Sequence, residues 1–242
     1  VLLNLTTAGL IIFGGLGFLV ILDIAKKRCF KKLSFHSKVV ISTSIVLIIA
    51  GTLLLKATED ISWLGAFFQS VSARTAGFST YAIGDFTNAG LFVLCVLMFI
   101  GASPGSTGGG IKTSTFFVLF QAARSACVKK NVCAFRRSIS RQNISKASMI
   151  TVLSMMVVCV ATFLLCVLEP DRTFIQVFFE VVSAFGTVGL STGITPGLSV
   201  AAKIVIIFVM FIGRLGAFTL LTIWISHPEP KIRYSEENIA IG

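Results

Sequence analysis

The sequence predicts an all-α integral membrane protein that repeats a unit of helix, re-entrant hairpin and helix. Three observations predict this fold class. Hydrophobic residues fill 55% of the 242 positions and charged residues only 13%, whereas about a quarter of a soluble domain is charged. The hydrophobic residues are grouped in long blocks, as spanning helices require. Twice in the chain, a short apolar stretch followed by a Gly-containing segment lies between two such blocks.

The distribution of charge predicts the orientation of the spans and argues against nucleic acid as a partner. Although the net charge is +11, 15 of the 21 Lys and Arg residues lie in three segments beside apolar blocks, 26–38, 121–146 and 226–242. Five of the ten acidic residues lie in the connections expected on the opposite side, at Glu59, Asp60, Asp85, Glu169 and Asp171. Because short basic segments stay on the cytoplasmic side, we expect a multi-pass protein of the plasma membrane. Its surroundings are then the lipid bilayer.

The first part of the chain contains two predicted spans and a hairpin. Residues 1–23 predict a span in which Gly14-Gly15-Leu16-Gly17 permits close helix packing. Residues 39–55 predict a second span without a charge. Residues 61–73 are apolar but too short to cross a bilayer, and an extended segment containing Gly77 follows. Since the basic segments on either side are cytoplasmic, residues 61–80 are expected to enter the membrane from outside and return.

The third span, 88–120, is interrupted by FIGASPGSTGGGIKTSTF at 99–116, which holds one Pro and five Gly. Irregular backbone at membrane depth is tolerated only where protein buries it or where it lines a watery cavity. We therefore interpret the interruption as a hinge or gate on a transport route. The predicted gate residues in it are Gly101, Ser103, Pro104, Gly105, Ser106, Thr107, Gly108, Gly109, Gly110 and Lys112.

The second part of the chain repeats this order. Residues 147–168 predict a fourth span, 173–196 a second hairpin, 198–225 a last span, and 226–242 a cytoplasmic tail. Arg214 lies more than ten residues from either predicted end of the last span, where a positive charge costs roughly 2.5–3.5 kcal/mol on insertion scales. We expect Arg214 to face a pore and to hinder or gate cation passage. Lys112 is a similar case, although it could instead reach the cytoplasmic face.

The two hairpins are copies of one sequence. The pattern Phe-Phe-x-x-Val-Ser-Ala begins at Phe67 and again at Phe178, 111 positions later. After one inserted residue, the Gly77-Phe78-Ser79-Thr80 sequence matches Gly189-Leu190-Ser191-Thr192 at an offset of 112. About four such units surround the axis of a filter-lined pore, and this chain holds two units and a trailing helix. We therefore expect an N-terminal part that holds the remainder.

The second hairpin resembles a potassium filter. Its Thr187-Val188-Gly189-Leu190 sequence is close to TVGYG, in which backbone carbonyls replace the hydration shell of the ion. Glycine suits such a loop because it adopts positive φ without steric cost. The C-terminal dipole ends of the two short helices would favour a cation. Backbone carbonyls therefore form the predicted ion site, with potassium as the ion.

Other functional classes fit less well. The GSTGGGIKTS sequence resembles a phosphate-binding loop, but Ile111 separates Gly110 from Lys112 and no β-strand precedes it. No constellation of His, Asp and Glu indicates a membrane enzyme, and six scattered Cys without a CxxC indicate packing residues and reduced thiols. We therefore predict no enzyme and no covalently bound cofactor. A sodium transporter of the same fold and a solute carrier without a filter remain alternatives.

Four sequences together resemble the Trk/Ktr/HKT superfamily of potassium transporters, most closely its KtrB-type subunits. They are SARTAGFST (72–80), FIGASPGSTGGGIKTSTF (99–116), SAFGTVGLSTGITP (183–196) and GRLGAFTL (213–220). The resemblance implies four helix–pore-loop–helix repeats around one pore in a potassium-channel-like fold, of which the chain holds about two and a quarter. Residues 1–25 would be the second helix of repeat two, 39–120 repeat three and 147–225 repeat four.

The resemblance also implies a function and the residues that perform it. It implies potassium uptake by a homodimer under a cytoplasmic ring of nucleotide-binding, RCK-type regulatory subunits, with sodium as a coupling or activating ion. The gate would be residues 101–110 below the filter, with Arg214 near it. Two departures matter: Ala217 stands where such proteins often have Pro, and two filter segments are absent, so the chain alone is not expected to conduct. The filter residues it implies are Thr75, Ala76, Gly77, Phe78, Thr187, Val188, Gly189 and Leu190.

Overall fold

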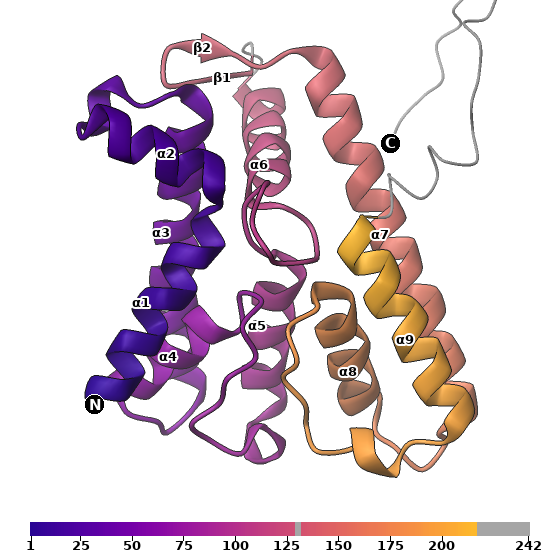
Figure 1. Cartoon of the computed structure of the whole chain (residues 1–242). Helices are drawn as coiled ribbons and strands as arrows, with labels where there is room; N and C mark the ends of the chain where they lie inside the picture. The colour runs from indigo at the N-terminus through magenta and orange to yellow at the C-terminus, as the bar shows by residue number, and fades with distance from the viewer. Residues whose placement is uncertain (129–131, 217–242) are drawn as a thin grey trace, which may run out of the picture.

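The computed structural model describes residues 1–128 and 132–216. Within these ranges the chain is mostly helical, with the helices standing side by side and one small β-hairpin at the cytoplasmic end (Figure 1). The helices are α1 (Leu2–Leu16), α2 (Phe18–Lys27), α3 (Phe35–Thr58), α4 (Trp63–Ser72), α5 (Asn88–Phe99), α6 (Thr113–Val128), α7 (Arg141–Leu168), α8 (Phe174–Gly186) and α9 (Val200–Leu215). The strands are β1 (Cys133–Ala134) and β2 (Arg137–Ser138), which pair antiparallel.

Among the described residues, two helices are long and apolar enough to cross a bilayer on their own. They are α3, with 24 residues, and α7, with 28, which at about 1.5 Å per residue measure about 36 and 42 Å. Helix α3 is longer than the predicted span 39–55 because it starts four residues earlier, where the Ser34 hydroxyl accepts a hydrogen bond from the backbone N–H of Ser37. Over their full lengths, both helices are long enough to cross the hydrocarbon core of about 30 Å.

The predicted span over 1–23 is broken in the structure into two helices, α1 and α2. The helix breaks at Gly17, whose φ is 80°, and the axes of α1 and α2 differ by 96°. A Cβ at Gly17 would overlap the Ser103 side chain and the Pro104 carbonyl. Gly14, by contrast, has no atom within 4 Å of where its Cβ would stand. The small residues therefore mark a kink against the 100–112 loop and not a face of close helix packing.

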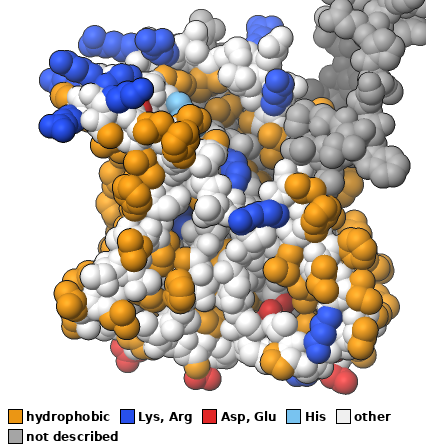
Figure 2. Space-filling view, in the orientation of Figure 1, with side chains coloured by type: hydrophobic (Ala, Val, Ile, Leu, Met, Phe, Trp, Pro, Cys, Tyr) orange, Lys and Arg blue, Asp and Glu red, His pale blue; other side chains and the backbone are white. Residues whose placement is uncertain are grey.

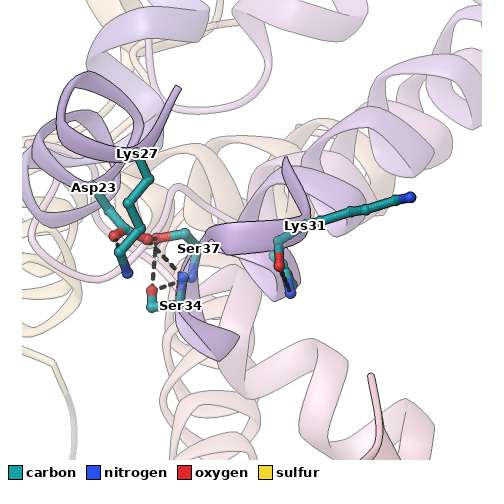
Figure 3. Close-up of polar contacts among 6 residues, drawn as sticks. Asp23, Lys27, Lys31, Ser34 and Ser37 are labelled. Atoms are coloured by element: carbon teal, nitrogen blue, oxygen red, sulfur yellow. Dashed lines mark hydrogen bonds and ion pairs between the residues drawn. The ribbon is translucent and has the colours of Figure 1, made fainter. Parts of the chain in front are cut away.

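The connection from α2 to α3 is held by one carboxylate. Asp23 on α2 accepts hydrogen bonds from the Ser34 backbone N–H at 2.8 Å and from the Ser37 hydroxyl at 2.7 Å. It also pairs with Lys27 one turn later, at 2.7 Å. Figure 3 shows these side chains converging from the two helices. The contacts fix α2 across the cytoplasmic end of α3, which orients the kinked segment.

The prediction that the last helix continues over 198–225 is also not met within the described residues. Helix α9 ends at Leu215, and Gly216 follows with φ 86°. Arg214 is therefore in the last turn of this helix and not in its middle. Residues 217–225, Ala217 among them, and the predicted tail 226–242 lie outside the described residues.

The best-buried part of the molecule surrounds α8. Phe179 and Phe185 on α8, Leu94 and Met98 on α5, and Leu165 on α7 are all fully buried. The ring of Phe99 lies 5.8 Å from that of Phe185, so the end of α5 packs beside the end of α8. Figure 2 shows most basic side chains at one end of the molecule and acidic ones at the other, with hydrophobic flanks around a paler central band that holds a few further basic side chains.

Candidate functional site

The two short helices end inside the fold, and each is followed by backbone in unusual conformations. After α4, Thr75 and Gly77 have φ of 73° and 78°. After α8, Thr187 and Gly189 have φ of 50° and 94°. Threonine resists this left-handed region because it is β-branched, so its surroundings must hold it there. In both segments the glycine has the positive φ that the sequence predicted. In each segment a threonine also has a positive φ, which the sequence did not predict.

A serine of each short helix braces the segment that follows it. The Ser72 hydroxyl donates to the Phe78 carbonyl, and the Ser183 hydroxyl donates to the Leu190 carbonyl at 2.6 Å. Ser183 also accepts from the backbone N–H of Gly189 at 3.3 Å. The two serines are 111 positions apart, and the two carbonyls 112. The two hairpins are therefore alike in their hydrogen bonds as well as in sequence.

A second brace joins each short helix to the returning segment of its hairpin. In the first hairpin the Gln69 amide donates to the Ser79 hydroxyl at 2.7 Å. At the equivalent place Glu180, 5% exposed, accepts from the Ser191 hydroxyl at 2.6 Å. It also accepts from the Thr192 N–H at 2.9 Å and hydroxyl at 3.2 Å, and from the Thr195 hydroxyl at 2.8 Å. Sequence reasoning left Glu180 without a role, although the hydroxyl residues that follow the filter sequence were the signal for one.

The interruption of the third span is a closed loop between α5 and α6. Ile100 and Ile111 form a parallel backbone bridge, and the Ile111 N–H donates to the Phe99 carbonyl at 3.1 Å. The Thr113 N–H donates to the Ala102 carbonyl at 3.3 Å. The chain therefore leaves the helix line and returns to it at nearly the same point. Figure 1 shows this loop between the ends of α5, α6 and α9.

The loop lies against the first residue of each predicted filter segment, 75–78 and 187–190. The backbone N–H of Gly109 donates to the Thr187 hydroxyl at 3.1 Å. A Cβ at Gly108 would overlap the Thr75 hydroxyl, and one at Gly101 would also contact the Thr75 side chain. The two filter segments abut as well, since a Cβ at Gly77 would overlap the Val188 carbonyl. Glycine is therefore required here by close approach of the backbone.

The loop is also held from the N-terminal side. The Ser103 N–H donates to the Gly15 carbonyl at 3.1 Å, and its hydroxyl donates to the Leu16 carbonyl. The Phe18 N–H donates to the Gly105 carbonyl at 3.2 Å. Within the loop, the Ser106 hydroxyl donates to the Ser103 carbonyl at 2.6 Å. The break at Gly17 thus exposes backbone groups that bind the loop.

Two positively charged side chains donate hydrogen bonds to backbone carbonyls of the loop. Lys112 donates to the Gly108 carbonyl, and Arg214 donates to the Thr107 carbonyl. Arg214 reaches the loop from the last turn of α9. A sequence repeat that the prediction did not use indicates the position of Arg214: Met-Phe-Ile-Gly occurs at 98–101 and again at 210–213. Arg214 therefore stands where the third span has Ala102, immediately after the glycine.

Sequence reasoning missed one further residue beside the filter. Arg74 precedes Thr75 and is 8% exposed. Its Nη2 donates to the Ser44 hydroxyl on α3 at 3.3 Å, and its Nε has no hydrogen-bond partner among the described residues. A cavity of about 20 Å³ lies beside it, between α1, α3 and α4. A buried guanidinium at this position adds positive charge close to the first filter segment.

The predicted site residues therefore come together, while their surroundings differ from the expectation. All eight predicted filter residues lie in the two braced segments, and a groove of about 230 Å³ runs along the second one between α8 and α9. The gate residues form one loop against both segments, with Lys112 and Arg214 bonded to it. Arg214 approaches from a helix end, where the sequence predicted the middle of a span.

Comparison with known proteins identifies relatives of this chain. A family model described as a cation transport protein, TrkH, matches residues 39–235. The chain is 41% identical to the Ktr system potassium uptake protein B of Vibrio alginolyticus, over all of this chain and 56% of that protein. It is 37% identical to the potassium/sodium uptake protein NtpJ of Enterococcus hirae, over all of this chain and 58% of that protein. The chain thus spans a little over half the length of these curated relatives.

A solved structure has the same fold. The potassium transporter TrkH from Vibrio parahaemolyticus matches with a TM-score of 0.72, over 92% of this chain and 52% of that chain. At 23% identity the match shows the fold alone, and it confirms the predicted all-α membrane class. Because the family model covers most of the sequence and curated relatives exceed 35% identity over its full length, the chain belongs to the TrkH family of cation transport proteins.

Proposed function

We propose that the protein containing this chain takes up potassium ions across the plasma membrane through a filter-lined, gated pore. The observation that supports this most is the shared construction of the two filter segments, each with a left-handed Thr and Gly and a serine brace. The printed names of two relatives, Ktr system potassium uptake protein B of Vibrio alginolyticus and of Bacillus subtilis, support potassium as the substrate. Backbone carbonyls of 75–78 and 187–190 are the proposed ligands.

The gate is the 100–112 loop at the inner ends of both filter segments. In the described conformation it contacts Thr75 and Thr187, and Arg214 and Lys112 place positive charge on it. Positive charge beside a narrow cation route opposes passage. Deleting 105–109 removes both carbonyls that these cations bind, and potassium flux in proteoliposomes is expected to rise. Unchanged flux in a folded variant would remove the gate assignment while leaving the filter intact.

The proposed architecture has four units around one axis. Residues 1–25 supply the second helix of unit two, 39–120 unit three and 147–225 unit four, with 226–242 as a cytoplasmic tail. We also propose a homodimer in the bilayer and a cytoplasmic ring of nucleotide-binding, RCK-type subunits as the regulatory partner. We propose no covalently bound cofactor, because backbone carbonyls are the proposed ligands of the ion. These assignments follow from the resemblance of the four sequences quoted above.

The direct test is potassium-dependent growth of a strain that lacks potassium uptake, complemented by the full-length protein. Gly189→Ser is expected to reduce selectivity for potassium over sodium, because serine resists a φ of 94°. Gly193→Ser is a matched control: its φ is 91° and, as at Gly189, no atom lies within 4 Å of the added Cβ. Absence of growth despite membrane expression would refute potassium uptake. Equal selectivity in the two variants would refute the filter assignment.

Sodium transport is the second candidate, and a relative's printed name favours it, since NtpJ is described as a potassium/sodium uptake protein. Sodium acts in this proposal as a coupling or activating ion, or in the alternative as the transported ion. Isotope fluxes of both ions through the same proteoliposomes separate these roles. A solute carrier without a filter would instead show saturable organic-solute uptake that is insensitive to substitutions at Gly77 and Gly189.

A further inference from the structure

A hydrophobic cavity of about 510 Å³ lies between α5, α6, α7 and α8, beside the 100–112 loop. Its volume is typical of small-molecule sites, roughly 300–1,000 Å³. We propose that this cavity binds the acyl chain of a membrane lipid, packed against both ends of the loop. Its lining residues outside the loop ends include Phe92, Cys95, Val96, Phe120, Ala123 and Met155.

The depth of the cavity selects an acyl chain over a lipid headgroup. Thr151, Met155 and Val158 line it from α7, which begins at Arg141 on the cytoplasmic side. At about 1.5 Å per residue these positions lie about 15–26 Å along a helix of about 42 Å. The cavity therefore lies at the middle of the bilayer, where only hydrocarbon is present.

The chemistry of the lining agrees with that choice. The Thr151 hydroxyl donates to the Ala147 carbonyl of its own helix at 3.0 Å, so it offers no donor to a ligand. Phe92, Phe120 and Met155 are 57%, 60% and 55% exposed, so the opening is bordered by apolar groups. An empty void of this size would forfeit dispersion contacts along its walls. A flexible hydrocarbon chain restores these contacts without requiring a polar partner.

The cavity reaches the two points at which the loop begins and ends. Phe99, Ile100 and Ile111 line it, and Ile100 and Ile111 form the bridge that closes the loop. An acyl chain packed on these side chains stabilises the bridged conformation, because opening the bridge would disrupt that packing. This coupling rests on the proposed gate, whereas binding of the chain does not.

A second apolar groove provides a matched control. It has a volume of about 360 Å³, lies between α7 and α9, and is lined by Met156, Val157, Val160, Ala161, Leu164, Val205, Phe208, Val209 and Ile212. No residue of the 100–112 loop lines it. Ala123→Trp fills the first cavity from an exposed small residue of α6, and Val160→Trp fills the control groove. Val96→Trp is a second variant for the first cavity, should Ala123→Trp fail to fold.

Binding is tested on the full-length protein in liposomes that contain a phosphatidylcholine with a diazirine in its acyl tail. After illumination, mass spectrometry is expected to find lipid adducts on Phe92, Phe120 and Met155. Ala123→Trp or Val96→Trp should reduce them several-fold, and Val160→Trp should leave them unchanged. The proposal would be overturned if adducts on these residues were no more frequent than adducts on the rest of α7. It would also be overturned if protein–protein cross-links through these residues revealed a second copy of the protein in the cavity.

Coupling to the gate is tested by potassium flux in the same liposomes. Because a fixed indole supports the bridge as the acyl chain does, Ala123→Trp should lower flux several-fold and remove its dependence on acyl-chain length. Val160→Trp should leave the flux and its dependence on acyl-chain length unchanged. Adducts with unchanged flux would support the lipid site and refute its coupling to the loop. Adducts in a wild-type protein that carries no potassium would support the lipid site and refute the proposed function instead.

Discussion

At the scale of single residues, the two proposed filter segments depend on side chains outside them. Ser72 and Ser183 bind the carbonyls of Phe78 and Leu190, and Glu180 binds Ser191 and Thr192, which follow the second segment. Removing a buried acceptor that has several donors lowers the free energy of unfolding by more than the hydrogen bonds contribute net, because the donors are left buried and unsatisfied. These polar side chains therefore hold the backbone in conformations that its own residues resist.

Replacing Glu180 by Ala leaves the hydroxyls of Ser191, Thr192 and Thr195 without this acceptor. The expected loss of unfolding free energy is about 3 kcal/mol, together with reduced selectivity for potassium over sodium. Thermal unfolding in detergent and ion flux in liposomes are the measurements. Glu180→Gln, which keeps one acceptor oxygen, should lose less. If Glu180→Ala were as stable and selective as the wild type, the brace would have no role in the filter.

Glu169, at the C-terminal end of α7, makes stability depend on pH. The Ser199 backbone N–H donates to it at 2.6 Å, and this bond, with nearby Arg172 and Lys203, lowers the pKa of the carboxyl. A lowered pKa in the folded protein gives stability that is present above the unfolded pKa of about 4.3 and lost as pH falls through the folded value. The difference in melting temperature between wild type and Glu169→Gln should therefore shrink in acid. A difference that stays constant from pH 7 to pH 3 would contradict this assignment.

At the scale of elements, the sequence predicted the helices and hairpins better than their breaks. The short helices α4 and α8 lie within the predicted 61–73 and 173–196 because an apolar run followed by Gly is a local signal. The kink at Gly17 depends on contacts with Ser103 and Pro104, 86 and 87 positions later, and no local pattern distinguishes such a kink from a packing face. The end of α9 likewise depends on Gly216, which has apolar neighbours.

The kink gives a paired test of the contact between α1, α2 and the loop. Gly17→Ala forces a Cβ into the Ser103 side chain at positive φ, which costs about 1–2 kcal/mol for the conformation alone. Gly14→Ala, with open space around it, should stabilise the helix by up to about 1 kcal/mol. Thermal unfolding and potassium flux of the two variants are compared. Equal effects of the two substitutions would show that the loop does not depend on the kink.

At the scale of the whole molecule, the charge pattern orients every element. Basic side chains gather at the end formed by α2, the start of α7 and the β-hairpin, while acidic side chains lie at the opposite end (Figure 2). Both hairpins enter from the acidic end, since α4 and α8 follow Glu59 and Glu169. The orientation could be predicted from the sequence because it depends on the positions of charges along the chain and not on tertiary contacts.

This orientation predicts which cysteines a membrane-impermeant maleimide reaches. Cys29, Cys127 and Cys133 are exposed and lie in the basic segments, so they should react only in inverted vesicles. Asp171→Cys, introduced into a protein whose native cysteines are replaced by Ser, should react on intact cells. The matched control is Asp85→Cys, which lies on the same side in the other hairpin unit and should behave identically. Labelling of Cys29 on intact cells would show that the topology is the reverse of the predicted one. The 100–112 loop would then lie on the outer side of the proposed filter, where it could not act as a gate on the cytoplasmic side.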